Sequence, residues 1–140
     1  MSLVTEIQTR FRANATITAL VETQRIKEQW IAQGETHPTI TLSVTEHQHG
    51  HHLGGGGGYA EPLLEVHVWA RKSSDKDTIA EAVRSSLQGF SGTLTTIVVR
   101  GITLELDQEF YESSRVAAQD GFYHRVMQFK VFHVESIPAF

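Results

Sequence analysis

Histidines at alternating positions are the residues of this chain most suited to chemistry. The stretch from Glu46 to Pro62 reads EHQHGHHLGGGGGYAEP, and in it His47, His49 and His51 lie two residues apart. On a strand, residues two apart project from the same face, so this spacing can present imidazoles to one metal ion. A catalytic zinc or iron site usually needs a third protein ligand, and no nearby histidine or carboxylate stands at a diagnostic spacing.

The glycines around these histidines weaken the metal interpretation. Gly50 and the run of glycines after Leu53 leave the backbone free, which makes a preorganised ligand set costly. A small metal-dependent enzyme or metal-binding protein that uses His47, His49 and His51 is therefore the alternative interpretation, and a solvated loop is the favoured one.

Other catalytic patterns fit the sequence less well. The segment LGGGGGYAEP lacks the Gly-Lys-Ser/Thr ending of a phosphate-binding loop, and a strand rather than a helix follows it. No serine stands in a Gly-x-Ser-x-Gly turn. We therefore expect no enzymatic activity, no cofactor and no resident metal.

Two alternating segments flank the histidine and glycine stretch. In residues 39–45, Ile40, Leu42 and Val44 share one face, and in residues 63–71 apolar residues again occupy every second position. The two segments are expected to pair as a hairpin, and the stretch at about 46–62 is then its long and flexible connecting loop.

The remaining pattern predicts two helices and three more strands. An amphipathic N-terminal helix breaks near Asn14, which caps its second part, and a helix capped by Ser74 runs to a stop at Gly89. Residues 94–99 and 102–110 have strand character, with a bulge or bend at Gly101, and a long strand closes the chain. The expected fold is α+β: a largely antiparallel β-sheet with two helices packed on one face, in a single domain over residues 1–140.

Polar residues on the strands suggest contact rather than catalysis. His67 and Trp69 share the polar side of their strand, and tryptophan is enriched in the cores of interfaces. Asp107 and Glu109 share a strand face that we expect to be solvated. The candidate contacts to a partner or another subunit are His49, His51, His52, Leu53, Tyr59, His67 and Trp69.

Composition narrows the class of protein. The chain of 140 residues has a net charge of -4, which argues against a protein that coats nucleic acid, and it has no cysteine for disulfides or thiolate ligands. Its first residues lack the pattern of a signal peptide, and no window resembles a membrane span. The cytoplasm of the producing cell is the expected place of synthesis.

The order of several short motifs resembles the bacteriophage tail-completion, or tail-terminator, family. The motifs are W-x-A-Q-G, a loop ending in LGG, the strand ending VHVWAR, the helix IAEAVRSSLQGFSG, a strand pair ending in YE, and GFYHRVMQFKVF. They span roughly residues 3 to 134. The histidine and glycine content of the loop departs from the family's usual form.

This resemblance implies a structural protein of the virion tail, assembled in the bacterial host cytoplasm from a phage, prophage or gene transfer agent. It implies an α+β subunit that forms a ring, usually a hexamer, on the head-proximal end of the tail tube. The implied partners are further copies of the chain, the tail tube protein and the head or neck connector, with DNA only passing through the channel.

Overall fold

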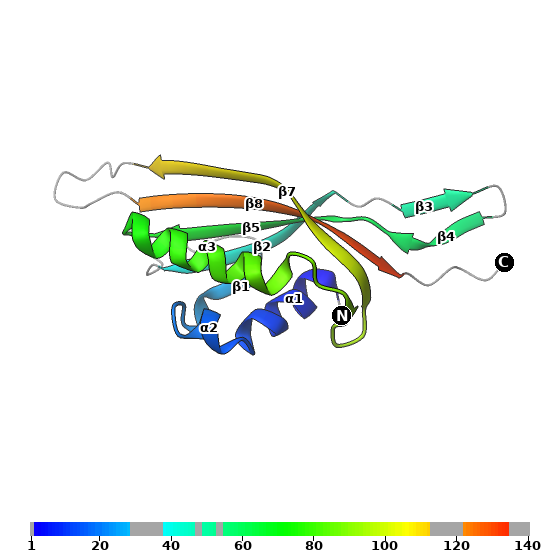
Figure 1. Cartoon of the computed structure of the whole chain (residues 1–140), viewed down its shortest axis with the longest axis horizontal. Helices are drawn as coiled ribbons and strands as arrows, with labels where there is room; N and C mark the ends of the chain where they lie inside the picture. The colour runs from blue at the N-terminus through cyan, green and yellow to red at the C-terminus, as the bar shows by residue number, and fades with distance from the viewer. Residues whose placement is uncertain (1, 29–37, 47–48, 53–54, 113–121, 135–140) are drawn as a thin grey trace.

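The computed structural model describes residues 2–28, 38–46, 49–52, 55–112 and 122–134 (Figure 1). Its elements follow in the order α1 (Leu3–Arg12), α2 (Ala15–Thr18), the short 3-10 helix η1 (Thr23–Arg25), β1 (Ile26–Glu28), β2 (Thr39–Glu46), β3 (His49–His52), β4 (Gly55–Ala60), β5 (Leu63–Ala70), α3 (Ser73–Leu87), β6 (Gly92–Thr93), β7 (Val98–Glu112) and β8 (Phe122–Val134). None of the helices in this described part has the length and hydropathy of a membrane span.

The strands form one mixed sheet. β1 pairs with β2 in parallel, and every other pairing between described strands is antiparallel. Helices α1, α2 and α3 lie on the same side of this sheet (Figure 1). The expected α+β architecture with helices on one face is therefore found, with one parallel pair at its edge. The sequence RIKE is too short and too mixed in pattern to reveal β1.

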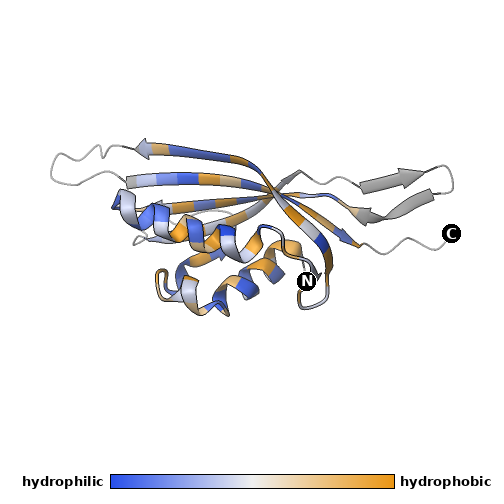
Figure 2. Cartoon of the chain, viewed as in Figure 1, coloured by the Kyte–Doolittle hydropathy of each residue, from blue (hydrophilic) through white to orange (hydrophobic). Residues whose placement is uncertain are grey.

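Alternation on the strands builds the core. Val66 and Val68 on β5 face the helices together with Met127 and Phe129 on β8, and all four are fully buried. The buried stripe of α3, which includes Ile79 and packs over this layer, contributes to the same cluster. Each such side chain stabilises the fold by about 1.5–3 kcal/mol through burial. Figure 2 shows the apolar residues alternating along the strands and gathered on the sides of the helices that face them.

The N-terminal helix breaks where the sequence predicts. The Asn14 side chain accepts hydrogen bonds from the backbone N–H groups of Thr16 and Ile17, at 3.0 and 3.2 Å, and so begins α2. The start of α3 differs from the prediction. Ser74 is not its cap, because the helix begins at Ser73 and its N-cap, Lys72, makes no side-chain capping bond. The helix ends as expected, with Gly89 at a φ of +78° just after it.

The strand predicted at residues 94–99 is largely a turn. Only Gly92–Thr93 and the residues from Val98 onward pair as strands, and the Leu94 N–H donates to the Ile97 carbonyl at 2.8 Å. The predicted irregularity at Gly101 is present, since the pairing of β7 with β8 shifts between Val99 and Gly101. Residues 94–99 are apolar residues and threonines, a composition typical of strands. Their backbone nevertheless turns, and the turn is held by a contact from α1 that the local sequence does not reveal.

That contact comes from the buried carboxylate of Glu6. It accepts hydrogen bonds from the backbone N–H groups of Thr96 and Ile97 and, at 2.7 Å, from the Thr96 hydroxyl. Burial by itself would raise the pKa of Glu6, but these hydrogen bonds outweigh it and lower the pKa below its usual value. Glu6 thus ties α1 to the turn before β7.

The stretch predicted as a loop contains two strands. β3 and β4 pair with each other, with a shift of register between His49 and His51, and they extend the β2–β5 hairpin beyond the body of the molecule (Figure 1). The predicted antiparallel pairing of β2 with β5 is confirmed. The flexibility of residues 46–62 stays a prediction.

Candidate subunit-contact surface

The side of the sheet away from the helices carries a polar and aromatic cluster. His67 and Trp69 alternate on β5 with valines that face the helices, and Trp69 pairs across the ladder with His124 on β8. We call Glu65, His67, Trp69, His124 and Gln128 the histidine cluster. The structure thus brings two of the predicted contact residues together and adds His124 to them.

Hydrogen bonds link this cluster into one chain. Gln128 Nε2 donates to Glu65 Oε2 at 3.0 Å, the other Glu65 oxygen contacts His67 Nε2, and His67 Nδ1 lies 2.6 Å from His124 Nε2. Two neutral imidazoles satisfy the chain when His67 Nε2 donates to Glu65 and His124 Nε2 donates to His67 Nδ1. Full protonation of both rings would place one N–H against another.

The rings of the cluster are also stacked. The Trp69 and His124 ring centroids are 3.6 Å apart with a 10° angle between the planes. The ring centroids of His67 and His124 are 4.8 Å apart. Trp69 Nε1 donates to the buried Thr41 hydroxyl at 3.4 Å. Trp69 is half-buried rather than fully exposed, and the aromatic ring exposed beside it is that of Phe110, whose side chain is 47% exposed.

Burial controls the protonation of His124. The residue is only 8% exposed, and burial together with the nearby His67 lowers its pKa to about 4, although Glu65 acts in the opposite direction. His124 is therefore neutral at neutral pH. A neutral stacked imidazole suits a packed contact surface, because no charge has to be desolvated when a partner covers it.

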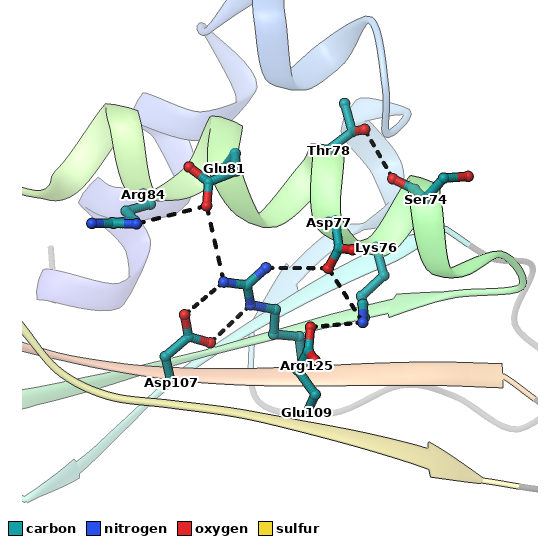
Figure 3. A network of polar contacts seen from close by, with 9 residues as sticks. All are labelled: Ser74, Lys76, Asp77, Thr78, Glu81, Arg84, Asp107, Glu109 and Arg125. Carbon is teal, nitrogen blue, oxygen red and sulfur yellow. Dashed lines mark hydrogen bonds and ion pairs between the residues drawn. The ribbon is translucent and has the colours of Figure 1, made fainter.

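A second polar group holds the strands beneath this surface against α3. The Arg125 guanidinium lies between α3 and β7 and donates to both carboxylate oxygens of Asp107, at 2.8 and 2.6 Å, and to Asp77 at 3.3 Å (Figure 3). The hydrogen bonds that Arg125 donates to Asp107 raise the pKa of Arg125. The strand face of Asp107 and Glu109 keeps contact with solvent as expected, with side chains 26% and 54% exposed, and the two carboxylates are in addition ion-paired with Arg125 and Lys76.

Lys76 completes this polar group. Its ammonium is buried and lies 2.7 Å from Glu109 and 3.2 Å from Asp77 (Figure 3). Burial by itself would lower the pKa of Lys76, but the hydrogen bonds that its ammonium donates to the two carboxylates outweigh it and raise the pKa. The packing of α3 on β7, which sequence alone does not give, brings Lys76 to Glu109.

The other predicted contact residues lie apart from the histidine cluster. His49, His51 and His52 are on β3 and Tyr59 is on β4, in the hairpin that precedes β5, whereas Trp69 stands near the far end of β5. Leu53 and His47 lie outside the described residues. Among the described residues, no group of three histidines or carboxylates is placed to hold a metal ion.

Comparison with known proteins gives the chain its context. The family model described as Tail completion protein gp17 matches residues 5–133. None of the curated protein sequences matches significantly. Among solved structures, a chain from the "Virion of native gene transfer agent (GTA) particle" has the same fold, with a TM-score of 0.70, 17% identity and 96% of each chain covered. Because the family model matches nearly the whole described chain, this protein belongs to the tail completion protein gp17 family and is a structural component of the virion tail.

Proposed function

We propose that this chain forms a ring on the head-proximal end of the tail tube, ends tube growth there and provides the surface to which the neck of the head binds. The family match over residues 5–133 is the observation that carries this proposal. In this role the partners are the tail tube protein, the neck connector and further copies of the chain, six in the ring by analogy with the hexamer that the family resemblance implies.

The surface chemistry supports a contact role. His124 at the centre of the histidine cluster is neutral and stacked on Trp69, and Phe110 and Tyr111 expose aromatic rings near the end of β7. Aromatic residues are enriched where protein partners bury surface. A net charge of -4 suits a ring through which DNA passes without being retained.

Deletion of the gene from its element, followed by electron microscopy of the particles, tests this function. We expect tails of uncontrolled length, or full-length tails that never join heads, and restoration of normal particles by the wild-type gene. Normal particles from the deletion would contradict the proposal. Labelling an epitope fused to the chain locates it independently: the expected position is the head-tail junction, and label along the tube or at the distal tip would also contradict it.

A further inference from the structure

The two sides of the sheet end in different ways. On one side the outermost described strands are β1 and β3, and on the other it is β7. The edge of β1 is already used, because the Ile26 carbonyl accepts hydrogen bonds from Gln8 at 2.8 Å and from Arg12 at 2.9 Å, both on α1. Among the described strands, the edges left without a strand partner are those of β3, of most of β7, of β2 beyond Leu42 and of the two-residue β6.

β7 offers a long edge. It pairs with β8 along its length and with β6 only at Val98 and Val99, and the Ile102 carbonyl is taken by the Gly89 N–H at 2.9 Å. From Thr103 onward no described strand pairs with its outer side. Unpaired edges of this kind are templates for strand addition.

β3 offers the complementary edge at the opposite side of the sheet. It pairs only with β4 among the described strands, and the β3–β4 hairpin projects away from the body (Figure 1). β3 itself reads HGHH and contains no proline, so each of its residues has a backbone N–H and a carbonyl for strand pairing. We propose that β3 of one copy of the chain adds to the outer edge of β7 of the next copy, so that the sheet continues from subunit to subunit around the ring.

The charges favour this pairing over the symmetric one. Glu105 lies on the unpaired part of β7 outside the ion pairs of Asp107 with Arg125 and of Glu109 with Lys76, whereas residues 47–60 contain no acidic side chain and four histidines. Two β7 edges side by side would bring like charges together across the ladder, which destabilises the pair. Histidine beside a carboxylate is attracted in its protonated form. Pairing unlike edges is heterologous, and heterologous contacts generate rings when the rotation closes.

This inference rests on the proposed function, and cross-linking within assembled particles tests it. The chain has no native cysteine, so His51→Cys on β3 and Gln108→Cys on β7 can be introduced together without background. Treatment with a short bismaleimide should then produce a ladder of covalent multimers on a denaturing gel. Thr103→Cys in place of Gln108→Cys covers the other end of the edge. The matched control combines Gln108→Cys with Lys27→Cys, at the edge of β1 that α1 covers, and should produce no ladder.

The possible outcomes separate this inference from the function on which it rests. A ladder from either β3–β7 pair, lost in the control and weakened by Glu105→Lys, supports edge pairing. Particles that contain the variant chain but yield no ladder from either pair overturn it and leave the ring-forming function intact. Absence of the wild-type chain from purified particles would overturn both.

Discussion

His124 is buried on the sheet face opposite α1, α2 and α3, and its chemistry follows from that position. Burial and the neighbouring His67 hold its pKa at about 4, below the usual value of 6.5. The unfolded chain therefore takes up a proton at this residue before the folded chain does. The contribution of His124 to stability is complete above pH 6.5 and is lost as the pH falls from 6.5 to about 4.

A His124→Gln variant should reduce this pH dependence. The free energy of unfolding of the wild type should fall by up to about 3 kcal/mol between pH 6.5 and 4 because of this residue alone. Glutamine keeps a donor for His67 but has no ring to protonate or stack, so we expect about 1 kcal/mol less stability at pH 7 and a flatter curve below pH 6.5. Urea unfolding at several pH values measures both effects.

His133→Gln is the matched control for this experiment. His133 is on the same strand, and its Nδ1 contacts the Val134 carbonyl at 3.0 Å, away from the histidine cluster. This variant should keep the acid-induced loss of stability seen in the wild type. Equal pH dependence in the wild type and His124→Gln would show that His124 does not titrate as its burial requires.

Alternation predicts which face a residue occupies, but not its neighbour across the ladder. The spacing of His67 and Trp69 placed both on the polar side of their strand, and this is confirmed. Their pairing with His124 depends on the register between β5 and β8, which hydrophobic pattern alone leaves open for residues 57 positions apart. The same reason explains why the contact of Asp107 with Arg125, across the β7–β8 ladder, could not be predicted from the sequence.

Among the elements, length and periodicity decided what could be predicted. α3 and the alternating strands β2, β5 and β8 each repeat their pattern several times, whereas β1 and β6 are three and two residues long. The glycine run carries no side-chain period, so β4 could not be distinguished from a loop. Strand formation there depends on backbone pairing with β3 and with the last two residues of β8.

The position of α3 on β7 and β8 depends on Arg125, and Arg125→Ala tests this. Its side chain is only 12% exposed and donates hydrogen bonds to both carboxylate oxygens of Asp107. Removing it leaves Asp107 without the cation that both of its oxygens contact, whereas Asp77 keeps Lys76 at 3.2 Å. For Arg125→Ala we expect a loss of about 2 kcal/mol in the free energy of unfolding. Arg125→Lys should lose less, because lysine keeps the charge but cannot make the bidentate hydrogen bond to the carboxylate.

Arg84→Ala provides the comparison on the same helix. Arg84 is 42% exposed and its ion pair with Glu81 spans 3.7 Å, so its removal should change stability by less than about 0.5 kcal/mol. Chemical denaturation of the variants in parallel measures the difference. If Arg125→Ala were as harmless as Arg84→Ala, packing rather than this polar group would hold α3 in place.

For the molecule as a whole, the body of the domain and the projecting hairpin have separate roles. The hydrophobic cluster is built from α1, α2, α3 and the central strands, while β4 joins the rest of the sheet through Tyr59 and Ala60 opposite Val134 and His133. Assembly proteins need a body that folds alone and edges that pair on docking. The hairpin can therefore be shortened without unfolding the domain.

A variant with Asn-Gly in place of residues 50–59 tests this separation. His49 and Ala60 are directly paired across the hairpin, so a two-residue turn can connect them, and Asn-Gly favours the required turn type. The variant loses the pairing of Tyr59 with Val134 but keeps that of Ala60 with His133. Its Tm should change by less than about 4 °C, because one lost backbone pairing costs about 1 kcal/mol.

In the deletion background the variant should nevertheless fail to restore normal tails, whereas a gene with only Gln48→Ala should restore them. A large fall in Tm would show that the hairpin supports the fold itself, and restored tails would show that assembly does not use it.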